Sequence, residues 1–473
     1  MLCQLVALGR RTVTGRLCAA GRQFQDWTAD YRLLARERVD RDEMFTVARR
    51  EVGGQLKEKE PLVAAMDDTL LRKRGKKISG VSYKRDPLSP PFRFNLVTGL
   101  RVLQISAALP LAPRPAPALS IPIDLVHAPA APKPKKKAPP EEWTRYRQLQ
   151  KEMNLSRRGA ERIARLREQL DHDPGGPERE LLMAVDGSYT NQTVLRNLPP
   201  RTALVGRVRK DANFFYPPHN QTAGPGRKKS YGQPAPTPEQ LRQDESVPWQ
   251  TVPVFAAGKR HDFKVKTIGP LLWKTAGPDR PLLLVVIAPL GYRPRKGSKL
   301  LYRQPAYLIA TSPQLELPLL LQAYVWRWGI EVNFRDQKQI VGVGQAQLRN
   351  QNSVQLDPAL ATAAYAFLIL AAKNAFPKLE LAPTLPPPKW RKSRPSSKPS
   401  TQDWINLLRL ELWGEALARS DREDITTLRR QGGMDHERSS GENFSGFVNA
   451  APNITKPLKS LPRLTSALLY VCN

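Results

Sequence analysis

Two kinds of apolar run alternate along the chain and predict a protein that mixes helices and strands. Short runs bounded by polar or Gly-containing segments predict strands at 61–71, 92–109, 181–189, 203–210 and 282–290. Longer stretches with helical spacing predict helices within 1–60 and at 156–170, 315–338, 358–376 and 403–413. The order of these elements predicts an α/β fold, with a mostly β segment between Asp186 and Glu331.

Gly- and Pro-rich positions mark where these elements are expected to stop. Gly99, inside the apolar run 92–109, is placed for a hairpin turn. The Pro-, Ala- and Lys-rich stretch 110–140 predicts a loop that cannot pack a core, and 217–248 predicts a polar loop. A second Pro-rich stretch, 377–401, predicts a linker before the last helix.

Composition adds a polyanionic partner to this picture. The 473 residues include 75 Lys and Arg against 43 Asp and Glu, which gives a net charge of +32. So large an excess favours nucleic acid, with an anionic membrane surface as the second choice. No uninterrupted apolar run approaches the roughly 20 residues of a membrane-spanning helix. Cys3, Cys18 and Cys472 have no paired spacing, which argues against a disulfide framework or a zinc site and suits a reducing compartment.

The segment YVWRWGIEVNFRDQK, residues 324–338, places a glutamate among basic and aromatic residues. A helix at about 100° per residue gathers five of them on one arc of about 80°. These five residues are Tyr324, Arg327, Glu331, Arg335 and Lys338. A solvated helix face with ion pairs four residues apart has the same pattern. Trp326 and Trp328 are predicted to be core residues, although stacking on an unpaired base is the alternative.

Two more acidic motifs stand where apolar strands are predicted to end. MDDT contains Asp67 and Asp68, and VDGS contains Asp186. Aspartate also caps helices and forms turns, so each motif alone is weak. Together with Glu331 they supply three carboxylates. Phosphodiester chemistry often uses two Mg²⁺ ions about 3.5–4 Å apart, and carboxylate oxygens are the preferred ligands of such hard cations.

At this point the sequence resembles the insertion-sequence DDE transposases, which are bacterial cut-and-paste enzymes. The segment 324–338 has that family's Tyr, two, Arg, three, Glu, six, Lys spacing. The stretches AAMDDTLLRKRGKK and LLMAVDGSYTN resemble the family's two aspartate strands. The resemblance covers about 61–375 and implies an RNase H-like core, a mixed sheet flanked by helices that a β-rich insertion interrupts.

Carried over residue by residue, the resemblance makes Asp68, Asp186 and Glu331 the catalytic metal ligands. Asp67 remains an alternative to Asp68, because adjacent strand residues point to opposite faces and only one can serve. The expected cofactor is Mg²⁺, as two ions, with Mn²⁺ able to substitute. The residues expected to contact DNA are Tyr324, Arg327, Arg335 and Lys338.

The implied organisation is a helical DNA-binding region followed by a divided catalytic core. Its expected parts are 1–60 (helical, DNA-binding), 61–200 (first part of the core), 201–313 (β-rich insertion), 314–376 (last part of the core, with the Glu helix) and 377–473 (linker and helical tail).

The implied activity is that of a transposase that binds inverted-repeat ends and cuts and joins DNA. It would act as a homodimer on double-stranded DNA in the bacterial cytoplasm, associated with the nucleoid and with no membrane partner. Two alternatives remain: a non-catalytic DNA-binding protein derived from such an enzyme, and a structure-selective nuclease or resolvase.

Overall fold

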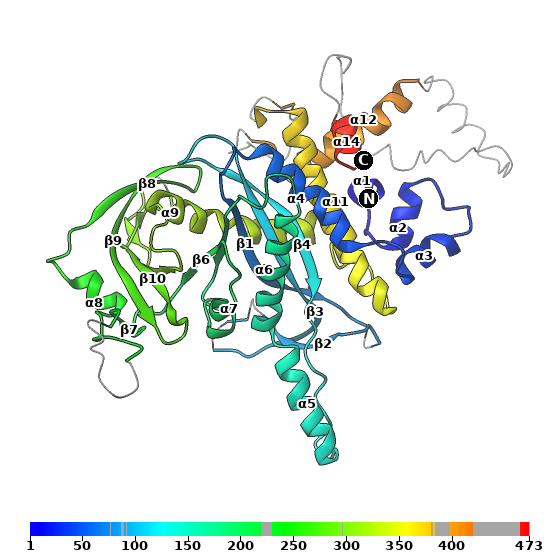
Figure 1. The fold of residues 1–473 in the computed structure, drawn as a ribbon. Helices are drawn as coiled ribbons and strands as arrows, with labels where there is room; N and C mark the ends of the chain where they lie inside the picture. The colour runs from blue at the N-terminus through cyan, green and yellow to red at the C-terminus, as the bar shows by residue number, and fades with distance from the viewer. Residues whose placement is uncertain are drawn as a thin grey trace.

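A computed structural model of the chain describes residues 1–75, 77–86, 89–90, 92–218, 229–295, 297–379, 382–383, 398–419 and 464–472. This part of the chain folds around one large mixed sheet with helices packed against it (Figure 1). The α/β class predicted from the sequence is therefore confirmed. Much of the predicted linker and tail lies outside the described residues.

The elements are as follows. The helices are α1 (Leu2–Val6), α2 (Val13–Ala19), α3 (Thr28–Ala35), α4 (Arg41–Gln55), α5 (Pro140–Glu152), α6 (Leu155–Asp171), α7 (Gln192–Arg196), α8 (Pro238–Gln243), α9 (Leu317–Trp326), α10 (Gly329–Asp336), the π-helix η1 (Gln337–Val341), α11 (Gln351–Ala375), α12 (Thr401–Arg419) and α14 (Leu464–Cys472). The strands are β1 (Leu62–Arg72), β2 (Ser82–Arg85), β3 (Leu96–Pro110), β4 (Ala118–His127), β5 (Leu181–Val185), β6 (Thr202–Arg207), β7 (Phe214–Phe215), β8 (Gln250–Ala256), β9 (Lys259–Trp273), β10 (Gly277–Ile287), β11 (Gly291–Tyr292), β12 (Leu301–Tyr302) and β13 (Ala306–Ala310).

The main sheet has eleven strands in the order β2-β3-β1-β5-β6-β13-β10-β9-β7, with β4 beside β3 and β8 beside β9. β1, β5 and β6 are parallel, whereas β3 runs antiparallel to both β1 and β4. The strands of the 201–313 segment extend this same sheet through β13, apart from the small β11–β12 pair. The predicted insertion is thus rich in strands and continuous with the rest of the sheet.

Side-chain alternation along β1 divides the contacts of the sheet between its two faces. Ala65, on one face, packs against α10 through Ile330 and Phe334. Met66, on the opposite face, lies against α6, where a Cβ on Gly159 would be 3.1 Å from its Cε. The two adjacent aspartates that follow on β1 therefore point toward different helices.

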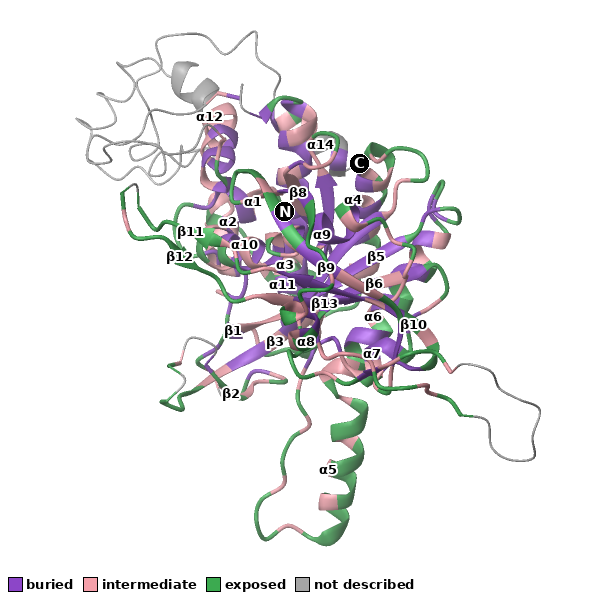
Figure 2. Cartoon of the chain, turned by 90° about the vertical axis from the view of Figure 1, so that its left-hand side faces the viewer, coloured by how far each residue is buried: buried purple, intermediate pink, exposed green. Residues whose placement is uncertain are grey.

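Helices from both ends of the chain gather at one end of the sheet (Figure 1). α4 begins at Asp40, whose carboxylate accepts hydrogen bonds from the first amides of the helix, and it packs on α11 and β4. α11 confirms the predicted core helix, since Ala363, Leu368 and Leu370 are fully buried. α5 has no buried residue and projects from the body of the protein (Figure 2).

α11 is the one described helix long and apolar enough to cross a membrane. However, 83% of its apolar window is buried inside the protein. The core helix of a soluble protein has the same length and composition, so α11 is consistent with a soluble protein.

The prediction of a loop that cannot pack a core at 110–140 is wrong, because β4 lies inside it. Ile121 and Ile123 are buried and β4 pairs with β3 along its length. Pro122 lacks an amide hydrogen, which an edge strand tolerates. The prediction rested on the many Pro, Ala and Lys residues of 110–140 and overlooked the short apolar run ALSIPIDLVH among them.

The predicted hairpin turn at Gly99 is also wrong. Gly99 lies within β3, paired with Arg72 of β1 on one side and Ser82 of β2 on the other. A Cβ at this position would be 2.7 Å from the carbonyl oxygen of Leu71. Glycine is needed here for the close approach of two strands.

The single helix predicted over 315–338 is broken in two. α9 ends at Trp326, α10 begins at Gly329, and a π-helix starts at Gln337. A Cβ on Gly329 would be 2.7 Å from the Cβ of Ser120, so the absence of a side chain lets α10 pack closely on β4. The periodicity of apolar residues continues through the break and does not reveal it.

Candidate active site

Asp67 and Asp186 lie side by side at adjacent parallel strands. In the β1–β5 pairing, Met66 stands opposite Val185, and each aspartate is the next residue on its strand or just beyond it. Neighbouring positions on parallel strands point to the same face. Asp67 is therefore presented on the face of the sheet that α10 covers, and Asp186, in the turn directly after β5, is near enough for its charge to act on Asp67.

Glu331 reaches the same place from the first turn of α10. The helix is anchored one residue earlier by Ile330, which is fully buried against Ala65. Since Ala65 and Asp67 share a face of β1, this packing turns α10 toward Asp67. Three segments far apart in the sequence thus contribute one carboxylate each to one region.

The electrostatics of Asp67 reflect both its burial and the acidic groups around it. Asp67 is only 9% exposed, and its pKa is raised to about 7. Burial is the main cause, and the negative charges of Asp186, Glu331 and Asp68 add to it, whereas a hydrogen bond from the Asp68 amide opposes it. A buried carboxyl whose pKa is raised further by neighbouring negative charges is what a site shared by several carboxylates produces.

Asp68 points to the opposite face of the sheet. Its Oδ1 accepts a hydrogen bond from the hydroxyl of Tyr189 at 2.8 Å, and its Oδ2 lies 3.3 Å from Nε of Arg101. On this geometry Asp67, the alternative that the sequence left open, lies on the face that α10 covers, and Asp68 does not. The sequence could not decide, because the register of β1 against β5 determines which face each residue occupies.

Arg327 and Lys338 bring positive charge to the carboxylates. Nη1 of Arg327 is 3.9 Å from Oδ2 of Asp67, and its guanidinium lies over the ring of Tyr324. Lys338 donates a hydrogen bond from Nζ to Oγ1 of Thr69 at 2.5 Å. Burial lowers the pKa of Lys338, while the charge of Glu331 opposes that shift.

Arg335 does not join this group in the structure. Its side chain is 59% exposed, and its Nε binds Oδ1 of the neighbouring Asp336 at 2.9 Å. Arg335 lies four residues after Glu331 on the same helix, α10, so it is the pairing with Asp336 that directs its side chain away from the carboxylates. Arg327 and Lys338 flank the carboxylates, and Arg335 faces solvent.

A buried polar network, missed in the sequence, holds α10 in place. Nδ2 of Asn333 donates to Oγ of Ser106 at 3.1 Å and to Oγ of Ser120 at 2.9 Å. The hydroxyl of Tyr365 donates to Oδ1 of Asn333 at 3.2 Å. Gln104, fully buried, also donates to Ser106. Polar residues at alternate positions of an apolar strand, Gln104 and Ser106, were the available signal.

The two tryptophans of the segment have different surroundings. Trp326 is 9% exposed and its Nε1 donates to the carbonyl of Ala116, which confirms the core prediction. Trp328 is 64% exposed, so the core prediction is wrong for this residue. It lies at the break between α9 and α10, where the chain leaves the helix that Trp326 anchors.

Carboxylate oxygens are suitable ligands for Mg²⁺. In this structure, however, some of these oxygens accept hydrogen bonds from nearby protein groups. Oδ1 of Asp186 accepts from the amide and hydroxyl of Ser188, and Oδ1 of Asp67 accepts from the Asp68 amide. Within the described ranges, no three His, Cys, Asp or Glu side chains are grouped closely enough to hold a metal ion as they stand. Binding an ion at Asp67, Asp186 and Glu331 would require some of these bonds to be exchanged for the ion.

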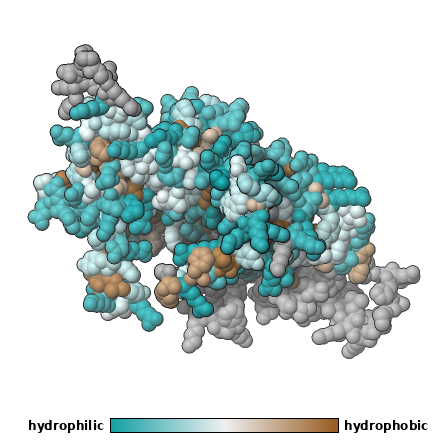
Figure 3. Space-filling model, turned by 90° about the horizontal axis from the view of Figure 1, so that it is seen from below, coloured by the Kyte–Doolittle hydropathy of each residue, from teal (hydrophilic) through white to brown (hydrophobic). Residues whose placement is uncertain are grey.

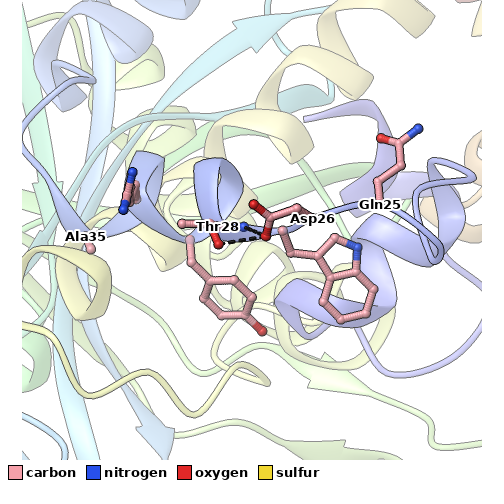
Figure 4. A pocket seen from close by; sticks show the side chains of 7 residues that line it. Gln25, Asp26, Thr28 and Ala35 are labelled. Atoms are coloured by element: carbon pink, nitrogen blue, oxygen red, sulfur yellow. Dashed lines mark hydrogen bonds between the residues drawn. The ribbon is translucent and has the colours of Figure 1, made fainter.

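A shallow groove elsewhere on the protein contains none of these residues (Figure 4). It runs along α3 and has a volume of about 540 Å³. Asp26 there accepts hydrogen bonds from the amide and hydroxyl of Thr28, and Nε1 of Trp27 donates to the carbonyl of Arg22. These polar groups already have partners within the helical region, so the groove does not replace the carboxylate region as the candidate site.

Comparison with known proteins adds no family to these observations. No family model matches the chain, and no curated protein matches it by sequence.

We predict that the Asp67 carboxyl makes the stability of the metal-free protein depend on pH. Its pKa of about 7 in the folded state exceeds the value of about 3.9 in an unfolded chain, so the folded state holds the proton more tightly. This contribution is complete below pH 4 and is lost as the pH rises through 7. The free energy of unfolding can be measured with urea in the presence of EDTA. Between pH 5 and pH 8 the wild type should lose about 2–3 kcal/mol more of it than Asp67→Asn does.

The exposed acid variant Glu178→Gln controls for the change in net charge. An equal pH dependence for Asp67→Asn and the wild type would contradict the prediction.

We also predict that Asn333→Leu destabilises the protein by about 1–3 kcal/mol, because Ser106, Ser120 and Tyr365 would lose a buried partner. Urea unfolding at one pH measures this. The control is Asn213→Leu at an exposed position outside the helices and strands, for which a change below about 0.5 kcal/mol is expected. Equal stability of the two variants would rule out a supporting role for the network.

Proposed function

We propose that the protein is a DDE-type DNA transposase that binds the inverted-repeat ends of a mobile element and cuts and joins DNA. The observation that carries this proposal is the convergence of Asp67, Asp186 and Glu331 on one face of the sheet, with Arg327 and Lys338 beside them. A surface ion-pair helix would not require aspartates from two other strands at the same place.

The strand order supports an RNase H-like core for this enzyme. The five strands β4-β3-β1-β5-β6 are adjacent, and β3 alone runs against the other four. Asp67 stands on β1, the central strand of this set, and Asp186 directly follows the adjacent strand β5. The glutamate follows on a helix after the additional strands β7–β13.

The residues of the site suit phosphoryl transfer. Bound Mg²⁺, or Mn²⁺ in its place, would activate the attacking oxygen and stabilise the leaving one. Asp67, Asp186 and Glu331 would hold the ions. Arg327 and Lys338 would hold the phosphates next to the scissile bond, as charge-assisted donors. The buried network around Asn333 would keep Glu331 at a fixed distance from the two strands.

The charge of the chain supports DNA as the partner. A net charge of +32 attracts a polyanion such as DNA to the protein. The three carboxylates are a small acidic region within this basic protein. As part of the same proposal, the enzyme works as a homodimer on two paired DNA ends in the bacterial cytoplasm. The exposed residue Arg335 is available to contact DNA beyond the cut site.

The rival is a DNA-binding protein that has lost catalysis. What favours it is that the carboxylates are not grouped for an ion as they stand. Purified protein, a plasmid that carries the inverted repeats flanking its gene, and Mg²⁺ or Mn²⁺ separate the two. Cleavage at the repeats supports the transposase, tight binding without cleavage supports the rival, and cutting of branched DNA regardless of sequence supports a structure-selective nuclease.

We predict that Asp67→Asn, Asp186→Asn and Glu331→Gln each lower the cleavage rate by roughly a thousandfold or more, because each removes a negative ligand from the ions. Gel assays of end cleavage in Mg²⁺ measure this, and DNA binding without cleavage should persist.

The neighbouring acid supplies a matched control. Asp68→Asn removes the same charge from the opposite face and should retain cleavage within about tenfold once its folding is verified. Loss of cleavage in Asp68→Asn with full activity in Asp67→Asn would reverse the choice between the two aspartates.

A further prediction concerns Trp328, which is 64% exposed and adjacent to Arg327. Stacking of an aromatic ring on an unpaired base is worth about 1–3 kcal/mol. Trp328→Ala should therefore weaken binding to end DNA that has unpaired bases at the cut site by roughly fivefold or more. Fluorescence anisotropy measures it, and Trp328→Phe should restore most of the affinity. Equal affinities for all three proteins would exclude stacking.

A further inference from the structure

The ribbon formed by β2 and the first part of β3 carries unusually exposed aromatic side chains. We call residues 82–86 and 92–99 the β2–β3 ribbon. In it Phe92 is 91% exposed, Phe94 69%, Tyr83 66% and Leu96 49%. Large apolar side chains that are grouped together and exposed indicate a surface that binds another molecule. Figure 3 shows the molecule from below, with small hydrophobic patches set in a hydrophilic surface.

The same stretch is strongly basic. Residues 72–101 contain nine Lys and Arg and one acid, Asp86, which pairs with Arg72 at 2.8 Å. The guanidinium of Arg85 lies 5.9 Å from the centre of the Phe94 ring, and Arg93 is exposed beside it. Aromatic rings interleaved with arginines suit a nucleic acid, whose bases and phosphates are contacted together.

The register places part of the ribbon on the same face of the sheet as the candidate active site. Gln104 of β3 stands opposite Asp67, and side chains at alternate residues share its face. Leu96 is one of these residues, and its partner across the strands is Arg85. Tyr83, two residues before Arg85, points the same way. DNA that lies across Asp67 and continues along β3 therefore meets these side chains.

The length of β3 gives the spacing. Leu96 lies eight residues along the strand from Gln104. At about 3.4 Å per residue this is about 27 Å, which corresponds to about eight base pairs of duplex at 3.4 Å each.

We propose that the β2–β3 ribbon binds duplex DNA about eight base pairs from the cleaved phosphodiester, and this inference rests on the proposed function. Its arginines contact phosphates, and Phe92 and Phe94 press against the groove or wedge into a base step. The same ribbon of a second copy is a poorer occupant, because it is equally basic and would be repelled.

Two variants test the ribbon on a 30-base-pair duplex of fixed arbitrary sequence, with binding measured by anisotropy over a series of salt concentrations. Phe92→Ser/Phe94→Ser should bind roughly fivefold or more weakly with an unchanged salt dependence. Arg85→Gln/Arg93→Gln should bind more weakly and lower the slope of log affinity against log salt by about 1.8, the value for two phosphate contacts. Tyr216→Ser, an exposed tyrosine outside the ribbon, is the matched control and should bind like the wild type.

A cross-link locates the contact. A photoreactive benzoylphenylalanine at position 96, the residue from which the spacing is calculated, should react with end DNA about six to ten base pairs from the cut.

Three results would overturn the inference. They are wild-type affinity in both ribbon variants, cross-links only at other distances, and a changed oligomeric state in sedimentation without a change in DNA affinity. Wild-type protein that does not bind duplex DNA would overturn the proposed function as well, whereas ribbon variants alone behaving like the wild type would leave it standing.

Discussion

The structure depends on placing carboxylates next to one another at the edge of an apolar core. Asp67 is almost fully buried, with Asp186 on the adjacent strand and Glu331 on the helix above. Such a group of like charges is unfavourable without a cation, and it adds to the effect of burial in raising the pKa of Asp67. Arg327, at 3.9 Å, supplies only part of the compensation, because its contact with Asp67 is long. The remaining negative charge is what a divalent cation would neutralise.

The break between α9 and α10 makes this arrangement possible. At the end of α9, Nε1 of Trp326 donates a hydrogen bond to the carbonyl of Ala116. At the start of α10, Gly329 has no side chain and so allows the helix to approach Ser120 of β4. Between these two anchors, Arg327 lies against Asp67 and Trp328 is left in solvent. Asn333 then fixes α10 through hydrogen bonds to β3 and β4. Because these bonds are directional, they determine the orientation of the helix more closely than the apolar contacts of Ile330 and Phe334 do.

The sequence predicted the α/β class and the strands that carry the aspartates, because the runs LVAAM and LLMAV are uninterrupted by polar residues. It left open the choice between Asp67 and Asp68, which depends on the register between β1 and β5 and hence on contacts about 120 residues apart. It missed β4 because Pro, Ala and Lys dominate the composition around a short apolar run. It mistook Gly99 for a turn and overlooked the helix break at Gly329, because in both cases glycine serves a close tertiary contact.

The charges of the protein also connect DNA binding to cation binding. The net charge of +32 attracts a phosphate backbone to the surface as a whole, and part of the basic β2–β3 ribbon lies on the face that carries Asp67. At the carboxylates themselves the local charge has the opposite sign and repels a phosphate. A divalent cation held there would remove this repulsion, and the phosphate would in turn complete the surroundings of the cation. We therefore expect DNA and the metal to strengthen each other's binding at the carboxylates, whereas contacts at the ribbon form without the metal.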